Sequence, residues 1–133
     1  MSEYPKISLA FNIGKNNDER IEAFELYRKA FNARKTSEST PPDGEDIHIC
    51  MEINGLEILL APGSEDFENK ENATVCQIHF DNEKDLRKTY EILIQEGHNF
   101  SIEGPLPWAI LFALVTDKFG FTWALYFNNV SGM

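Results

Sequence analysis

Cysteine, histidine and basic residues are scarce in this chain of 133 residues. Lysine and arginine number 12 against 22 aspartates and glutamates, which gives a formal net charge of -10. A phosphate backbone is bound by neutralising it with basic side chains, so this balance argues against nucleic acid as a partner. No apolar run approaches the roughly 18 residues of a membrane span, and the N-terminal MSEYPK lacks the basic-then-apolar order of a secretory signal. We therefore expect a cytoplasmic protein with neither a nucleic-acid nor a membrane partner.

The two cysteines, Cys50 and Cys76, both fall in apolar segments typical of strands. We expect them to be buried free thiols in a reducing compartment rather than a disulfide. The sequence also lacks a Cys-x-x-Cys pair, a nucleophile elbow, a phosphate loop and a dinucleotide-binding glycine motif. No common catalytic motif is therefore available to assign a reaction.

Apolar residues are abundant enough for an ordinary core. They make up 42% of the chain, and ten phenylalanines, four tyrosines and two tryptophans are among them. A chain of this length is expected to form one domain, residues 1–133, that buries about two-thirds of its unfolded surface.

The first half predicts a strand, a helix, a variable extended stretch and a hairpin. Asn16 or Asn17 can cap the helix, and Asn32 falls where a left-handed residue is favoured at its end. Asn54-Gly55 is a strong signal for a two-residue hairpin turn. The expected segments are residues 7–13 (strand), 34–46 (polar, with at least the second half a loop), 47–53 and 56–61 (hairpin strands), and 62–73 (an acidic loop).

The second half repeats this order of elements, although its sequence differs. Asp81 or Asn82 can cap its helix, which Gly97 is expected to close. Asp117 can close the last turn through its side chain, and Gly120 can take a positive φ there. The expected segments are residues 74–80 (strand), 98–107 (weakly extended), 109–116 (strand) and 121–127 (return strand).

This repeat predicts an α+β fold of two βαβββ modules, at about residues 1–65 and 72–133. Each module gives a small mixed sheet with one face under a helix, and we expect the two open faces to curl around a shared cleft. A cleft between repeats is a usual place for a small ligand. Residues 109–116 are apolar at nearly every position, which suggests a strand buried on both faces and favours a homodimer.

Three segments carry a resemblance to a known superfamily. Residues 23–31 (AFELYRKAF) look like a helix motif A..FY..AFG, residues 48–62 like a hairpin motif H..L.I.G..L.L.D, and residues 115–123 (VTDKFGFTW) like V.D.FG..W. With the order of elements, they resemble the vicinal oxygen chelate superfamily of glyoxalase I, extradiol dioxygenases and fosfomycin-resistance proteins. The PhnB-like branch is the most similar, and Asn32 departs from its usual glycine. The resemblance implies a glyoxalase-like fold and is consistent with a homodimer.

Metal-using members of this superfamily hold one divalent ion with His, Gln or Glu side chains from four strands. The resemblance places those positions at about Ser8, Leu59, Val75 and Ala124. Serine is a poor ligand, and the three aliphatic side chains cannot bind a metal. We therefore expect no metal cofactor, and a small organic molecule bound in the cleft without the usual metal site. Some branch members carry methyltransferase labels, but this sequence has no glycine motif for S-adenosylmethionine.

Polar and aromatic residues are the candidates for contact with that molecule. Gln77 and His79 alternate with apolar neighbours, so we expect them on the face opposite the helix, where they meet either a ligand or solvent. His48 is either a hydrogen-bonded structural histidine or a ligand contact, and Trp123 is either core or cleft. The complete set of cleft candidates is Ser8, His48, Leu59, Gln77, His79, Trp108 and Trp123.

Two alternatives remain open at this point. One is a metal-dependent lyase, isomerase or dioxygenase that holds Zn, Ni, Mn or Fe in a displaced site. Its ligands would be His48, Gln77 and His79, with Glu52 or Glu57. The other is a partner-binding subunit without a reaction, which would expose an apolar patch instead of an enclosed cleft.

Overall fold

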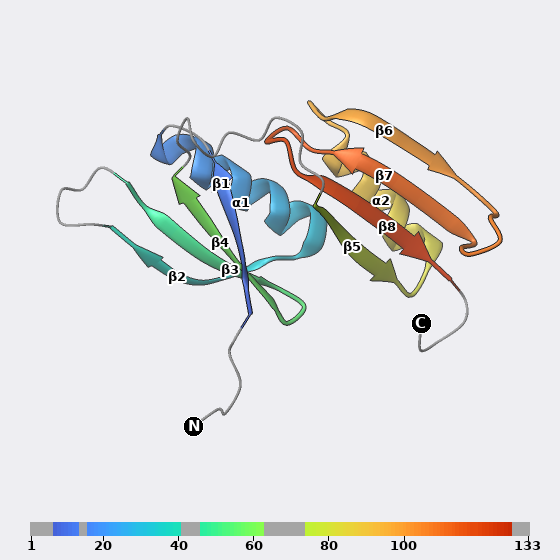
Figure 1. Ribbon diagram of the computed structural model, residues 1–133, viewed down its shortest axis with the longest axis horizontal. Helices are drawn as coiled ribbons and strands as arrows, with labels where there is room; N and C mark the ends of the chain where they lie inside the picture. Colours follow the sequence, from blue (N-terminus) through green and yellow to red (C-terminus); the bar gives the residue numbers. More distant parts are fainter. Residues whose placement is uncertain (1–6, 14–15, 41–45, 63–73, 129–133) are drawn as a thin grey trace, which may run out of the picture. The chain divides into compact units, whose positions relative to one another are not determined.

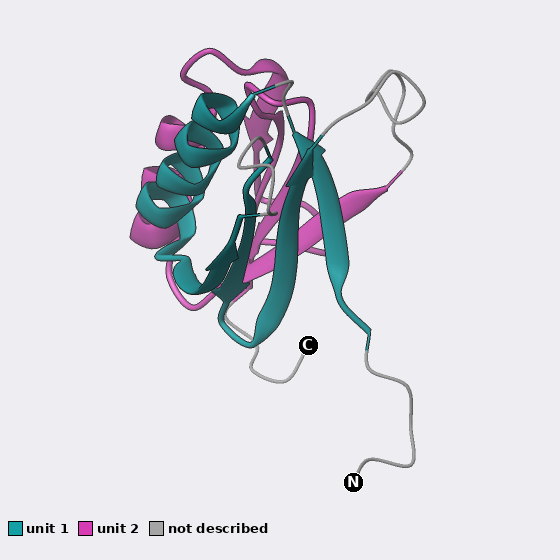
Figure 2. Cartoon of the chain, turned by 90° about the vertical axis from the view of Figure 1, so that its left-hand side faces the viewer, with its two compact units in different colours: residues 1–68 teal, residues 69–133 magenta. Residues whose placement is uncertain are grey.

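The computed structural model describes residues 7–13, 16–40, 46–62 and 74–128. The chain divides into two compact units, residues 1–68 and 69–133, which Figure 2 shows in different colours. Each unit holds one helix and four strands in the order βαβββ, which confirms the predicted α+β fold of two such modules. The shared cleft between their sheets stays a prediction, as does the acidic loop at 62–73, of which residues 63–73 lie outside the described residues.

Unit 1 forms a mixed four-stranded sheet with the strand order β1-β4-β3-β2 (Figure 1). Strand β1 runs parallel to β4, whereas β3 is antiparallel to both β4 and β2. The elements are β1 (Leu9–Ile13), α1 (Asn17–Phe31), β2 (Arg34–Ser39), β3 (His48–Ile53) and β4 (Leu56–Pro62). The predicted extended stretch at 34–46 is thus a strand in its first half.

Unit 2 repeats the same topology with the strand order β5-β8-β7-β6. Strand β5 runs parallel to β8, and β7 is antiparallel to both β8 and β6. The elements are β5 (Val75–Phe80), α2 (Glu83–Leu93), β6 (His98–Glu103), β7 (Leu111–Thr116) and β8 (Thr122–Phe127). The structural repeat is therefore complete even though the two sequences differ.

The ends of α1 are set by asparagines. The Asn16 side chain accepts a hydrogen bond from the Glu19 amide at 3.0 Å, so Asn16 is the cap and Asn17 is the first helical residue. Asn32 ends the helix in the left-handed region at φ 58°, and its amide donates to the Arg28 carbonyl. Asparagine tolerates this backbone better than most residues, which explains why it can stand where the PhnB-like motif has glycine.

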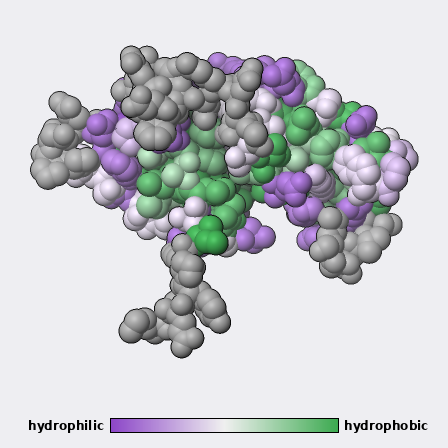
Figure 3. Space-filling view, in the orientation of Figure 1, coloured by the Kyte–Doolittle hydropathy of each residue, from purple (hydrophilic) through white to green (hydrophobic). Residues whose placement is uncertain are grey.

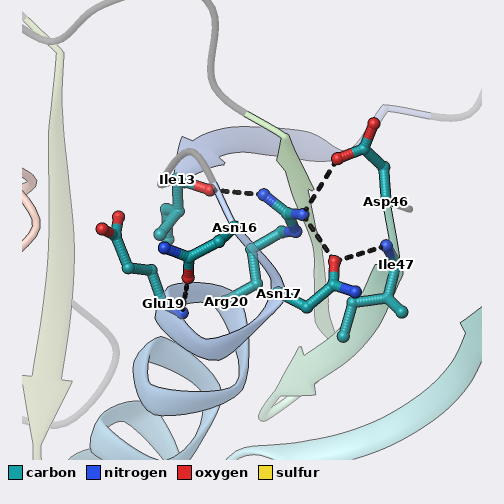
Figure 4. Close-up of polar contacts among 7 residues, drawn as sticks. All are labelled: Ile13, Asn16, Asn17, Glu19, Arg20, Asp46 and Ile47. Carbon is teal, nitrogen blue, oxygen red and sulfur yellow. Dashed lines mark hydrogen bonds and ion pairs between the residues drawn. The ribbon is translucent and has the colours of Figure 1, made fainter.

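A buried arginine joins three elements of unit 1 (Figure 4). The Arg20 guanidinium donates to the Ile13 carbonyl at 3.0 Å and to the Asn17 side chain at 2.8 Å, and it pairs with the Asp46 carboxylate at 3.4 Å. The same Asn17 oxygen accepts from the Ile47 amide at 3.0 Å. These bonds connect the end of β1, the first turn of α1 and the entry to β3.

The ends of α2 follow the same logic. Asn82, and not Asp81, caps the helix by accepting from the Asp85 amide at 2.8 Å. The helix ends at Leu93, and Gly97 follows after one further turn. A Cβ atom on Gly97 would lie 2.6 Å from the Leu93 carbonyl and 2.7 Å from that of Thr116, so only glycine fits this crossing.

One face of each sheet is buried beneath its helix, as Figure 2 shows for unit 1. In β3 the residues alternate between buried and half-buried, with Ile49, Met51 and Ile53 in the core. In unit 2, Leu86 and Leu93 of α2 are buried together with Trp123 and Leu125 of β8. The opposite face of each sheet is called its open face below.

Within the single chain, strand β7 is buried on one face and half-buried on the other. Leu111, Ala113 and Val115 are buried, whereas Phe112, Leu114 and Thr116 are only half-buried. Phe112 and Leu114 therefore give this chain an apolar open face, and the burial of that face within an assembly stays a prediction. A homodimer stays a prediction. Among the described helices, neither has the length and apolar character that crossing a membrane requires.

Candidate functional site

Asp117 organises the turn between β7 and β8. One carboxylate oxygen accepts from the amides of Phe119 and Phe121 at 2.8 and 3.1 Å, and the other accepts from the Trp123 indole at 2.9 Å. Gly120 takes φ 93°, as predicted. Both Asp117 and Trp123 are completely buried, so this motif builds the turn and the core. Trp123 was a candidate for the cleft, and that interpretation is wrong because its indole is packed on the helix side.

The open face of the second sheet gathers the best candidates. His79 lies beside Tyr126, which lies beside Phe112, in one row across β5, β8 and β7. Gln77 begins the neighbouring row, next to Ala124. Both Gln77 and His79 are exposed, on the face opposite α2, as their alternation with apolar residues predicts.

Four rings pack together on this open face, and we call them the aromatic cluster: His79, Trp108, Phe112 and Tyr126. Ring centroids are 4.9 Å apart for His79 and Tyr126 and 5.1 Å for Phe112 and Tyr126. Trp108 lies 4.8 Å from Phe112 at an interplanar angle of 76°, and 6.0 Å from Tyr126. The contacts of Phe112 with Trp108 and with Tyr126 are edge-to-face, an arrangement that aromatic pairs prefer. The cluster is thus a shaped apolar surface and not a loose collection of exposed rings.

A tight turn presents Trp108 to this cluster. Leu106 and Ala109 exchange two backbone hydrogen bonds, of 2.7 and 3.3 Å, so that Trp108 sits at the tip. The Asn128 side chain donates to the Trp108 carbonyl at 3.2 Å and accepts from the Ile110 amide at 3.3 Å. The turn is thereby fixed to the end of β8. Trp108 is nevertheless 54% exposed, so much of its indole remains available to a ligand.

A hydrogen bond adds polarity to the aromatic cluster. The Gln77 amide nitrogen donates to the Tyr126 hydroxyl at 2.9 Å. Phe112 and Tyr126 were not among the predicted cleft residues. The available signal was the alternation within β7 and β8, which puts both residues on the face of Gln77 once the register of β5 with β8 is known.

The open face of the first sheet is aliphatic and polar, without a ring cluster. Leu59 is half-buried and pairs with Cys50 on one side and Ala10 on the other. His48 is also half-buried, beside Ser39 of β2. Apolar side chains gather over the strands of this unit in the space-filling view (Figure 3).

The positions that the resemblance implies for a metal do not fit one. Ser8 is exposed just before β1, and Leu59 is half-buried in β4. Val75 is exposed at the start of β5, and Ala124 is buried in β8. This set offers one hydroxyl and three aliphatic side chains, whereas a divalent ion needs carboxylate, imidazole or thiolate donors.

The displaced metal site of His48, Gln77 and His79 with Glu52 or Glu57 draws on both units and stays a prediction. Within β3, a rise of about 3.3 Å per residue separates the Cα atoms of His48 and Glu52 by about 13 Å, so these two side chains do not form a metal-binding pair on the strand by themselves. Glu52 pairs instead with Arg34 at 3.2 Å. Within the part of the chain that the structure describes, no group of three or more His, Cys, Asp or Glu residues could hold a metal ion.

The two cysteines are free thiols in the structure, and both are half-buried. Cys50 lies on the open face of the first sheet, beside Leu59. Cys76 alternates with Gln77 and His79 and therefore lies on the helix side of β5. Burial raises the pKa of the Cys76 thiol, and the nearby Asp117 carboxylate raises it further. Cys76 is accordingly suited to packing and not to nucleophilic chemistry.

Two βαβββ units with mixed sheets define the glyoxalase-like fold of the vicinal oxygen chelate proteins, and this chain has that fold. A PhnB protein of Bacillus cereus is similar over 93% of this chain and all of its own, with 21% identity and a TM-score of 0.70. No protein-family model matches the sequence, and no curated protein is significantly similar to it.

Two further solved structures share the fold. The fosfomycin resistance protein FosX of Mesorhizobium loti is 15% identical over 95% of this chain and 92% of its own, with a TM-score of 0.61. A glyoxylase/bleomycin resistance protein/dioxygenase domain of Frankia is 16% identical over 96% and 98%, with a TM-score of 0.62. At such identities the likeness establishes the fold and leaves the activity to be argued from the residues.

Proposed function

We propose that this protein binds a small organic molecule through the open face of its second sheet, without the metal ion used elsewhere in the superfamily. The aromatic cluster carries this proposal, because it combines exposed ring surface with polar groups at defined positions. Ligand sites are mainly apolar and contain a few well-placed polar groups. His79 and Gln77 provide such groups beside the rings of Tyr126 and Phe112.

The side chains at the positions that the resemblance implies for a metal support the proposal that binding needs no metal. Leu59, Val75 and Ala124 cannot bind a metal, and Ser8 is a poor ligand. FosX and the Frankia domain are named for antibiotic resistance and for dioxygenase or glyoxylase relatives. Binding of a small molecule without a reaction requires no metal ligand from this chain, and we therefore favour it over a metal-dependent activity.

Thermal unfolding in the presence of a broad panel of small molecules tests the binding. The panel should include neutral, cationic, anionic, aromatic and aliphatic compounds, because mass action raises the melting temperature for any ligand of the native state. We expect at least one compound to raise it, and the rise to shrink in a Phe112→Ala variant. A panel without any stabilising compound would contradict the proposed function.

Elemental analysis of the purified protein tests the metal-free part separately. We expect no stoichiometric transition metal. One tightly bound metal per chain, together with turnover of thiol adducts or catechols that His79→Ala abolishes, would instead establish the metal-dependent alternative.

We further propose that the protein is cytoplasmic and forms a homodimer. The half-buried apolar residues of β7 support an interface on this side of the unit, although a bound ligand could cover them equally well. Sedimentation velocity with and without a stabilising ligand separates these cases. A monomer at all concentrations would rule out the homodimer.

A further inference from the structure

The second sheet contains no lysine or arginine, and its basic side chains are the imidazoles of His79 and His98. The sequences of its strands are VCQIHF, HNFSIE, LFALVT and TWALYF, in which lysine and arginine do not occur. The connection from 104 to 110, which includes the Trp108 turn, also contains neither residue. Glu103 lies beside Phe112 in the row of the aromatic cluster and is exposed. A negatively charged ligand would therefore meet the Glu103 carboxylate here, without the permanent positive charge of a lysine or arginine within the sheet.

The hydrogen bond from Gln77 makes the Tyr126 hydroxyl an acceptor on the Gln77 side. A phenol can accept and donate, and here it accepts from the Gln77 amide. Its own proton is therefore free to be donated to a third group. A ligand atom that accepts a hydrogen bond, such as a carbonyl oxygen or an aromatic nitrogen, matches this donor.

The Trp108 indole provides a stacking surface next to that donor. Its ring centroid is 6.0 Å from that of Tyr126, so one small molecule can contact both. The indole packs against the Phe112 ring, and the Trp108 backbone is held by a hydrogen bond from Asn128. Gly104 contributes as well, since a Cβ atom there would collide with the Ile110 carbonyl and displace the turn. A ligand consequently does not have to order the indole when it binds, which favours affinity.

We propose that the ligand of this site is a flat aromatic molecule that bears a hydrogen-bond acceptor and no negative charge. Its ring stacks on Trp108, and its acceptor takes the proton of the Tyr126 hydroxyl. Gln77 is the positioning residue that orients this hydroxyl, and the Glu103 carboxylate on a sheet without lysine or arginine disfavours anions. This inference rests on the proposed function, because it names the class of molecule that the same face selects.

The two tryptophans provide a direct readout of where a probe binds. Trp108 is exposed in the cluster, whereas Trp123 is buried with its indole bonded to Asp117. In a nitrogen-15 spectrum each indole gives one signal, and Trp108→Phe assigns them. We expect quinoline, a flat ring with an acceptor nitrogen, to move the Trp108 signal and leave the Trp123 signal in place. Movement of neither signal, or of the Trp123 signal alone, would overturn the inference.

Variants then test each contact by calorimetric titration of quinoline. Trp108→Ala is expected to weaken binding about tenfold through lost stacking, and Tyr126→Phe about fivefold through one lost hydrogen bond. Phe100→Ala is the matched control, since Phe100 is another exposed ring of unit 2 but contacts Tyr90 of α2. Its affinity should equal that of the unchanged protein. Full affinity in Tyr126→Phe would overturn the role of the acceptor.

Quinoline-6-carboxylate tests the charge selectivity. We expect it to bind about fivefold more weakly than quinoline, because its carboxylate is desolvated without a cationic partner. Equal or tighter binding would overturn this part of the inference. If quinoline fails while aliphatic or anionic compounds of the thermal panel stabilise the protein, the inference falls and the proposed function stands. If no compound stabilises it, the proposed function itself falls.

Discussion

The two open sheet faces share a topology but differ in chemistry. Counted from the hairpin glycines Gly55 and Gly120, Ala61 of β4 corresponds to Tyr126 of β8. By the same pairing, His48 of β3 corresponds to Phe112 of β7. The second face has a ring at both positions, and the first has neither a phenol nor a phenyl ring there. Positive charge differs too, since β2 begins with arginine and lysine and β6 has neither.

This difference shows that the repeat preserves the scaffold while the open faces are free to diverge. The helix-facing positions stay apolar in both units because each must bury its helix. The residues of the open faces do not have to pack against a helix. Their side chains can therefore differ between the two units according to what each face binds. The internal repeat also supplies matched controls, because paired strand positions of the second face have counterparts in the first.

The largest effect is expected at the hairpin of unit 2, which depends on a buried carboxylate. Asp117→Ala removes the acceptor of three hydrogen bonds, one of them from the buried Trp123 indole. We expect a loss of about 3 kcal/mol or more in the free energy of unfolding, measured with urea. Asp117→Asn should lose less, because it keeps an oxygen for the turn amides. Equal stability of the alanine variant and the original protein would contradict this account of the motif.

Alanine at two glycines compares the stability cost of a substitution in a tight connection, at Gly97, with that in a hairpin turn, at Gly55. Gly97→Ala would push a Cβ atom against two backbone carbonyls, so we expect a cost of about 2 kcal/mol. At Gly55 a Cβ atom would meet open space, so Gly55→Ala is destabilised only by the positive φ of 96°. We expect it to lose about 1 kcal/mol in the free energy of unfolding. Urea unfolding of both variants checks the order. A larger loss for Gly55→Ala would show that the crossing at Gly97 is less tight than described.

Ligand binding is expected to depend on one open face only. Phe112→Ala should weaken quinoline binding about tenfold, because Phe112 supports the Trp108 indole. His48→Ala, at the corresponding place of unit 1, should leave the affinity unchanged. Calorimetry of both variants makes the comparison. An equal loss in His48→Ala would show that the site extends over both sheets.

The smallest effect concerns the thiol on the helix side of β5. The raised pKa of Cys76 means that the folded protein holds this thiol proton more tightly than the unfolded chain. Alkylation should therefore start at higher pH in the folded protein than in urea, and any stability from this group is lost as the pH rises through the alkaline range. A Cys50→Ser variant isolates Cys76 for the measurement of iodoacetamide rates. Identical pH profiles in the two states would contradict the shift.

Much of the fold was predictable because its signals are local. Asparagines before both helices, Asn54-Gly55 in one hairpin and Asp117 with Gly120 in the other act within a few residues of their own position. The placement of Gln77 and His79 on the face opposite the helix was also predictable, because apolar and polar residues alternate along β5. Trp123 was harder, because an apolar strand position does not reveal which side the helix will cover.

The sequence by itself determined the order of elements, their caps and turns, and the lack of metal donors at the positions that the superfamily resemblance implies. Only the tertiary structure decided which open-face residues meet. Gln77 and Tyr126 are 49 residues apart in the chain, and the parallel pairing of β5 with β8 brings them together. Trp108 reaches them through its turn and Asn128. Such contacts depend on the register between distant strands, which hydrophobic alternation within any one strand does not specify.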